Sequence, residues 1–305
     1  MRFLLLCALV IVLIFFASQR ILNPQLNHNS MNDRLQHPLD TRLRYKIGHI
    51  DSRFNISHEQ LQNLAQQATD IWFLGTQKQF FVYDPNAQLT INLIYDQRQA
   101  DTEARNTQIT QIEQHRAYTD NERQKLTQFE SDLNFYKQQI DQLKSNYQDK
   151  LDRYNQQVEN FNQSHQSRSQ AGLEHLKFQK QQLQYEQQQL EQQIEGFNQK
   201  VTVLNTQVDN VNQMKQQFNQ SIDEFNRRFQ PRLFDKGLFN GREINIYEFQ
   251  SDDDLRLTLA HEFGHALGLN HTTEPHSLMY PVLEKQDFKN FSLTTADITL
   301  LQNRS

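Results

Sequence analysis

The chain has 305 residues, with 31 basic and 36 acidic side chains and a formal net charge of −5 at pH 7. This balance, without a concentrated basic patch, argues against nucleic acid as a partner. The sequence contains 1 cysteine, which excludes an internal disulfide framework, and its length suits one domain with an insertion.

The first feature along the chain is a continuously apolar run, residues 3–17, with Arg2 before it. Such a run is typical of an export signal or a short membrane anchor. Signal cleavage requires small side chains where Phe15 and Phe16 stand, so we expect residues 1–20 to be an uncleaved anchor. The positive N-terminal charge would place the rest of the chain outside the cytoplasm, in the periplasm or at the cell surface. Secretion after signal cleavage is the alternative.

A polar linker, residues 21–41, is expected to lead into the first part of an α+β domain, residues 42–103. Ser57 and Gln60 have the spacing of a capping box, and apolar residues then recur at helical spacing up to Trp72. Short apolar and alternating runs on either side of this helix predict strands. The strand positions are 43–48, 80–82 and 89–95.

The pattern changes in residues 104–230, which are rich in Gln, Asn and charge. Apolar residues recur there every three or four positions in two arms, residues 126–161 and 173–229. Between the arms, residues 164–172 contain no core position and form the predicted tip. We therefore expect a long antiparallel coiled-coil hairpin. A parallel coiled-coil dimer and a disordered low-complexity tract are the alternatives.

Residues 231–305 are predicted to return to the α+β domain and complete it. Asn240 and Gly241 stand between two apolar runs, residues 232–239 and 243–249, which is a hairpin signal. A helix should follow, because good capping residues come directly after this hairpin. The capping residues are Ser251, Asp252 and Asp253.

The helix that follows carries a metal-binding pattern. His261 and His265 are four residues apart, so their imidazoles lie on one face of the helix. Gly268 lets the chain leave the helix, and His271 can then return as a third ligand. Three neutral nitrogens leave the fourth position of Zn²⁺ open to water, as in catalytic sites. Glu262 follows the first ligand directly and can act as general base.

This pattern resembles that of the metzincins and, within them, the matrixins. In that family a Ser or Thr follows the third histidine, as Thr272 follows His271, and a methionine comes eight residues after that histidine, as Met279 does. The resemblance implies that Met279 forms a hydrophobic floor under the zinc, and that Pro281 and the residues after it line a substrate pocket. It also implies that Asp297 helps to hold the turn around Met279.

The resemblance implies an α+β, metzincin-like catalytic domain with a twisted, mostly parallel sheet and an antiparallel edge strand, here interrupted by the coiled-coil hairpin. The implied function is a zinc metalloendopeptidase with a polypeptide substrate. The hairpin replaces the loop in which relatives bind further ions and offers no His/Asp cluster, so we expect one zinc ion and no dedicated calcium site. The only cysteine, Cys7, lies in the leader, so no cysteine-switch latency is expected.

A different class of function is a coiled-coil scaffold of the cell envelope in which the protease domain is vestigial. An intact set of His261, His265, His271 and Glu262 argues against this alternative. The hairpin itself could recruit a coiled-coil partner or a second copy of the chain.

Overall fold

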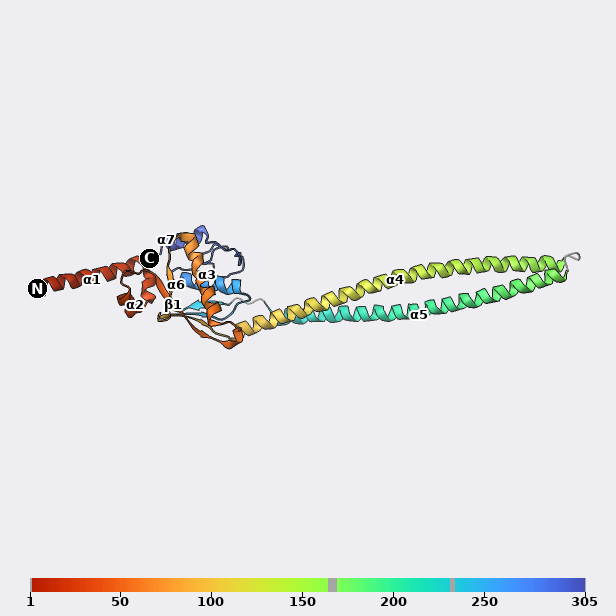
Figure 1. Ribbon diagram of the computed structural model, residues 1–305, viewed down its shortest axis with the longest axis horizontal. Coiled ribbons are helices and arrows are strands. Elements are labelled where there is room, and N and C mark those ends of the chain that lie inside the picture. Colours follow the sequence, from red (N-terminus) through yellow and green to blue (C-terminus); the bar gives the residue numbers. More distant parts are fainter. Residues whose placement is uncertain (1, 164–168, 231–233, 305) are drawn as a thin grey trace. The chain divides into compact units, whose positions relative to one another are not determined.

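The computed structural model describes residues 2–163, 169–230 and 234–304. The chain divides into two compact units, of which the first combines Met1–Thr107 with Gln230–Ser305 and the second is Gln108–Phe229. Figure 1 shows short strands and helices in the first unit and two long helices in the second. The described strands and the histidine motif all belong to the first unit.

The first unit is built around a five-stranded sheet in the order β2-β1-β3-β5-β4. Its strands pair in parallel, except that β4 at one edge pairs antiparallel with β5. This arrangement confirms the predicted mostly parallel sheet with an antiparallel edge strand. The strands are β1 (Leu43–Ile50), β2 (Phe81–Tyr83), β3 (Leu89–Leu93), β4 (Gly237–Phe239) and β5 (Glu243–Ile246).

The central strands supply the core of the sheet. Ile91 on β3 and Ile244 on β5 are fully buried, as expected where layers cover both faces of parallel strands. Gly48 on β1 lies against β3, where an added Cβ would be 2.1 Å from Thr90 Cγ2. Glycine therefore allows β1 to approach β3 closely at this point.

Two helices, α3 (His58–Thr76) and α6 (Asp252–Ala266), pack against each other in the first unit. α3 begins with the predicted capping box, in which the side chains of Ser57 and Gln60 accept from each other's backbone N–H groups. Fully buried Trp72 donates its indole N–H to the carbonyl oxygen of Ala260 over 2.9 Å. This bond ties α3 to the part of α6 that carries the histidines.

The predicted linker, residues 21–41, contains two short helices, η1 (Pro24–His28) and α2 (Met31–Gln36). Gln25 is fully buried, and its amide donates to the carbonyl oxygen of Thr41 over 2.9 Å. Polar composition alone did not indicate this folding, because the Gln25 amide N–H is paired with a backbone atom that lies 16 residues further along the chain.

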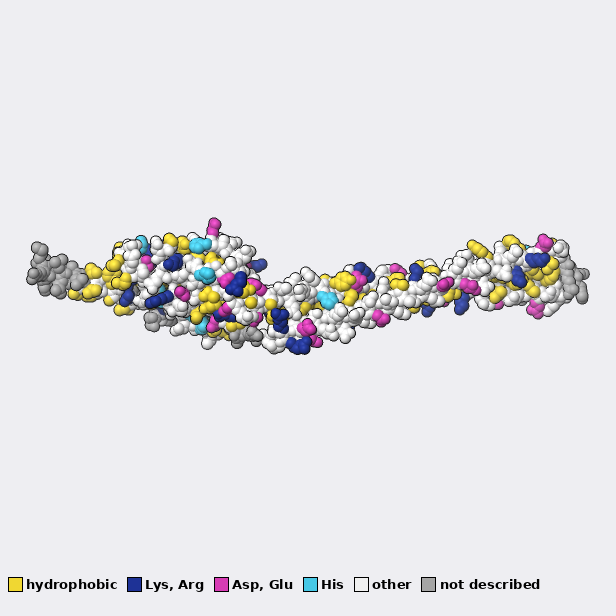
Figure 2. All heavy atoms as spheres, turned by 90° about the horizontal axis from the view of Figure 1, so that it is seen from below, with side chains coloured by type: hydrophobic (Ala, Val, Ile, Leu, Met, Phe, Trp, Pro, Cys, Tyr) yellow, Lys and Arg dark blue, Asp and Glu magenta, His cyan; other side chains and the backbone are white. Residues whose placement is uncertain are grey.

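The predicted leader forms α1 (Arg2–Leu22). Figure 2 shows hydrophobic side chains over its described part, where four of them are between 44% and 62% exposed. These four are Val10, Val12, Leu13 and Ile14. Among the residues that the structure describes, no helix is both long enough and apolar enough to cross a membrane.

The second unit is formed by most of α4 (Gln97–Gln163) and by α5 (Gln170–Arg228). Several side-chain contacts join the two helices, and residues later in α4 contact residues earlier in α5, so the helices run antiparallel. Among them are His115 with Phe218, Tyr136 with Phe197, and Lys150 with Glu186. Of the predicted tip, residues 164–168 lie outside the described residues. Ser169 caps α5 by accepting from the Gly172 N–H over 3.1 Å.

α4 begins at Gln97, ahead of the predicted boundary at residue 104, because its first turns have partners in the first unit. The side chain of Gln99 accepts from the backbone N–H of Phe249 over 3.0 Å. Thr102 donates to the carboxylate of Glu248 over 3.0 Å. The start of the long helix is therefore bonded to the segment that follows β5.

Candidate metal centre

α6 places His261 and His265 one turn apart, with their ring centroids 4.8 Å from each other. Ser251 caps this helix by accepting from the Asp254 N–H over 3.2 Å. Acidic residues fill its first turn, where they interact favourably with the helix dipole. The local sequence thus fixes the start of the helix that carries two of the histidines.

α6 ends at a turn that brings the third histidine back. Gly268 has φ 87°, in the left-handed region that glycine adopts without strain. The Leu269 N–H donates back to the carbonyl oxygen of Gly264 over 3.1 Å, which closes the turn. His271 then lies with its Nε2 atom 3.2 Å from that of His265 and 3.3 Å from that of His261.

The three Nε2 atoms fit a tetrahedral metal ion. They form a triangle with sides of 3.1, 3.2 and 3.3 Å. Ligand nitrogens at about 2.0–2.1 Å from tetrahedral zinc lie roughly 3.3 Å apart, close to these values. His261, His265 and His271 are therefore a group that can hold a metal ion.

The hydrogen bonds of the Nδ1 atoms determine the tautomers of His261 and His265 and leave their Nε2 lone pairs directed at a common point. His261 Nδ1 lies 2.6 Å from the carbonyl oxygen of Leu278, and His265 Nδ1 lies 2.8 Å from that of Leu269. A carbonyl oxygen only accepts, so each Nδ1 carries the proton and each neutral ring has its lone pair on Nε2. Two such lone pairs 3.1 Å apart repel each other unless a cation lies between them.

Burial keeps these rings neutral. It lowers the pKa of His261 to about 3, with a smaller contribution from the neighbouring His265. Burial also lowers the pKa of His265, partly offset by its bond to the Leu269 carbonyl. Neutral imidazole is the form that binds metal, so the surroundings prepare the ligands for an ion.

Glu262 lies beside the ligands and against the edge strand. An added Cβ on Gly237 of β4 would be 2.8 Å from Glu262 Oε1, so glycine makes room for this carboxylate. Burial raises the pKa of Glu262 to about 7, while the backbone N–H of Phe239 lowers it. Within the described residues no group donates to its buried Oε2 atom. A buried acceptor with this pKa is suited to taking up a proton.

Met279 is fully buried under α6. A Cβ added to Gly264, which lies between the two helical ligands, would be 2.3 Å from Met279 Sδ. A side chain at position 264 would thus displace the methionine. Pro281, the other residue singled out after His271, is exposed, whereas Leu283 beyond it is buried.

Asp297, on α7 (Thr295–Gln302), holds the turn that carries Met279. Its carboxylate accepts from the backbone N–H groups of Leu278 and Met279, each over 3.1 Å, and from the hydroxyl of Ser277. The Leu278 carbonyl in turn accepts from His261. Asp297 therefore orients a candidate metal ligand through one peptide unit.

Sequence reasoning gave no role to Gly237, Gly264, Lys236 or Asp254. Lys236 precedes β4 and donates to both oxygens of Asp254, over 2.9 and 2.8 Å, which fixes the edge strand to the start of α6. These roles depend on contacts across the fold. The one feature of the sequence that could have indicated such a role is the position of Gly264 between His261 and His265.

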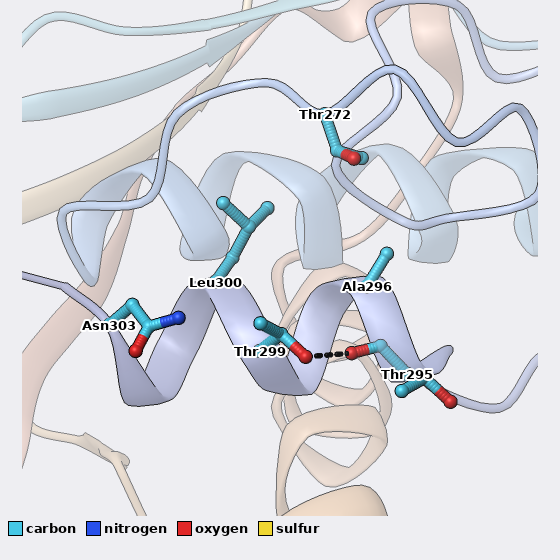
Figure 3. Close-up of a pocket in the computed structure, with 6 residues that line it drawn as sticks. All are labelled: Thr272, Thr295, Ala296, Thr299, Leu300 and Asn303. Atoms are coloured by element: carbon cyan, nitrogen blue, oxygen red, sulfur yellow. Dashed lines mark hydrogen bonds between the residues drawn. The ribbon is translucent and has the colours of Figure 1, made fainter.

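A cavity of about 350 Å³ lies between α7 and the loop after His271. Figure 3 shows its lining, in which Thr299 donates to the carbonyl oxygen of Thr295 over 2.7 Å. The lining residues are Thr272, Thr295, Ala296, Thr299, Leu300 and Asn303. None of the three histidines lines this cavity, so the metal centre is defined by the geometry of the histidines and not by this hollow.

Comparison with known proteins places this geometry in a family context. The profile of the Matrixin family matches residues 37–304. Over 49 residues the chain is 49% identical to matrix metalloproteinase-18 of Xenopus laevis, covering 16% of this chain and 10% of that protein. Over 42 residues it is 48% identical to matrilysin of Felis catus, covering 14% and 16%. It is also 47% identical over 49 residues to human neutrophil collagenase, covering 16% and 10%. The chain thus spans only a small part of the length of these relatives.

Proposed function

The chain belongs to the matrixin family, and on that premise we propose that it is a zinc metalloendopeptidase that hydrolyses peptide bonds of polypeptides. The observation that carries the proposal is the convergence of three histidine Nε2 atoms within 3.1–3.3 Å of one another. A zinc ion held by them would supply Lewis acidity to water and to the peptide carbonyl.

Glu262 would move the proton in this reaction. Its carboxylate takes a proton from the attacking water as the new C–O bond forms. The same carboxyl then gives the proton to the amide nitrogen as the C–N bond breaks, so that the amine leaves neutral. A pKa of about 7 suits both steps, since the group can exist in either form near neutral pH.

The polypeptide substrate would bind as an extended strand along β4. An edge strand offers unpaired backbone N–H and C=O groups, to which another strand can add. Gly237 and Phe239 of β4 lie next to Glu262. A peptide on this edge would therefore pass the carboxylate that moves the proton.

We further propose that α4 and α5 form an antiparallel coiled-coil hairpin. The side-chain contacts between the helices and the buried side chains of Leu133, Ile140 and Leu183 support this assignment. A hairpin of this kind would recruit or space substrates, through a coiled-coil partner or a second copy of the chain. Light scattering of the purified chain distinguishes monomer from oligomer.

The apolar part of α1 supports anchoring to a membrane with the catalytic domain outside the cytoplasm, and secretion after signal cleavage remains the alternative. Membrane fractionation of cells that express the chain, with an alkaline wash, tests the anchor. An anchored chain stays in the pellet, and recovery of a shortened chain from the medium would favour secretion.

The experiment that tests the proposed activity compares the zinc-loaded parent with Glu262→Gln on an unfolded protein substrate. We expect hydrolysis by the parent and a loss of at least about 100-fold in the variant, because the substituted amide cannot accept the proton. Equal zinc content in the two proteins is the control. Equal activity of the two would reject Glu262 as the base, and an inert parent with bound zinc would favour the scaffold alternative.

A further inference from the structure

The free edge of β4 has few backbone groups left for a substrate. In an antiparallel pair, alternate residues bond to the partner strand and those between them face away. Residues 236 and 240 bond to the β5 side, since Tyr247 N–H donates to the Lys236 carbonyl and Asn240 N–H to the Glu243 carbonyl. The backbone groups of Gly237, Phe239 and Gly241 therefore face the free edge, where the Phe239 N–H already interacts with the Glu262 carboxylate.

The last of these positions is already occupied. His28 Nδ1 lies 2.9 Å from the carbonyl oxygen of Gly241, so its N–H takes the bond that an added strand would use there. The His28 ring also packs edge-on against Phe239, with ring centroids 4.9 Å apart. The open edge of β4 thus ends at Phe239.

The segment that carries His28 is fixed to the sheet on both sides of that residue. Gln25 donates to the Thr41 carbonyl over 2.9 Å. The Asn29 amide donates to the Arg42 carbonyl and accepts from the Arg44 N–H, each over 2.9 Å, and so fills a strand-like position beside β1. We call residues 23–29 the N-terminal clamp. It precedes the part of the chain that matches the family profile, which begins at residue 37.

We propose that the N-terminal clamp closes one end of the substrate groove, and that His28 determines how far a substrate can extend on that side of the bond to be cleaved. This inference rests on the proposed peptidase function. An antiparallel substrate strand, the slightly more stable pairing, would have its N-terminal part at Gly241. The clamp would therefore limit recognition of residues on the N-terminal side of the cleaved bond.

The test is a series of synthetic peptides built around one core sequence and extended one residue at a time on either side. For the full chain with zinc, we expect kcat/KM to rise with C-terminal extension. On the N-terminal side kcat/KM should stop rising after about two residues. The backbone groups that face the free edge recur at every second residue, and the next such position after Phe239 is Gly241, which His28 blocks. An equal rise on both sides would overturn the proposal.

His28→Ala should remove the limit. N-terminal extension beyond the former limit should then raise kcat/KM by about fivefold for each backbone hydrogen bond gained. The matched control is His37→Ala, because His37 is an exposed histidine of the same N-terminal region. It should keep the profile of the parent. An unchanged limit in a folded His28→Ala protein would also overturn the proposal.

Binding of the same peptides, labelled with fluorescein, to Glu262→Gln separates this inference from the proposed function. If the parent cleaves no peptide but the binding affinity stops rising with N-terminal extension only, the clamp proposal is supported and the peptidase proposal is rejected. If the parent cleaves and the profile is symmetric, the clamp fails and the peptidase proposal stands. If no peptide binds, the clamp is rejected as well.

Discussion

His261, His265 and His271 differ in how the protein holds them. The first two donate from Nδ1 to backbone carbonyls and are buried or half-buried, whereas His271 is exposed. His271 comes into place only because the chain turns at Gly268. If a metal ion is bound, we therefore expect the position of His271 to depend on it more than the positions of the other two histidines do.

We predict that His271→Ala lowers zinc affinity by more than about 100-fold, since loss of a ligand should cost at least as much as loss of an outer-shell partner. Competition with a chelator of known affinity measures this change. His276→Ala is the matched control, because His276 is an exposed histidine of the same loop outside the triad. Equal affinity of His271→Ala and the parent would exclude His271 as a ligand.

Asp297 is predicted to be important for stability. Asp297→Ala removes a fully buried carboxylate that accepts from Leu278 and Met279 N–H groups, leaving these donors without a partner. The expected cost is about 3 kcal/mol of unfolding free energy. Denaturant unfolding of the zinc-free protein measures it. Asp287→Ala, at an exposed loop carboxylate, should cost much less. Equal costs would contradict this role for Asp297.

At the scale of elements, the sequence predicted what depends on local spacing. The capping box of Ser57 and Gln60, the hairpin turn at Asn240 and Gly241, and the cap at Ser251 all formed where local patterns placed them. The spacing of the three histidines likewise predicted that they lie together. The period of the helix places His261 and His265 on one face, and the turn at Gly268 brings His271 back to them.

The sequence did not predict elements that depend on distant partners. Residues 21–41 look like a linker because they are polar, yet Gln25 and Asn29 are buried against backbone groups of β1 and the segment before it. α4 begins early because Gln99 and Thr102 bond to the segment that follows β5. Such pairings join positions far apart in the chain, and no local pattern indicates them.

For α4 and α5 we predict that Leu183→Asn destabilises the helix pair. Leu183 is among the few buried side chains of this unit, and the change places an unpaired amide in its apolar interface. The expected cost is about 2–4 kcal/mol, measured by thermal unfolding followed by circular dichroism. Phe178→Asn is the control, since Phe178 is 57% exposed on the same helix, and should cost less than about 1 kcal/mol. Equal effects would argue against the proposed coiled coil.

At the scale of the whole molecule, the metal centre and the long helices belong to different compact units. The centre is built from α6, the loop after it and α7, and the first turns of α4 are bonded within the same unit. The second unit is therefore inserted into the sequence of the first, and the candidate metal ligands all belong to the first unit.

Replacing residues 108–229 with a flexible linker should leave zinc binding and cleavage of short peptides intact. The reason is that all three histidines, Glu262 and β4 keep their partners in the first unit. Metal analysis and peptide hydrolysis test this expectation. A folded deletion variant that no longer binds zinc would show that the long helices support the metal centre.

The central claim is that one zinc ion at His261, His265 and His271 makes the chain a peptidase. The most direct measurement is a zinc titration of the metal-free full chain while hydrolysis of an unfolded protein substrate is followed. We predict that activity rises with added zinc and reaches its plateau at about one equivalent, because a single three-histidine site is filled. Activity without zinc, or no activity when one equivalent is bound, would contradict it.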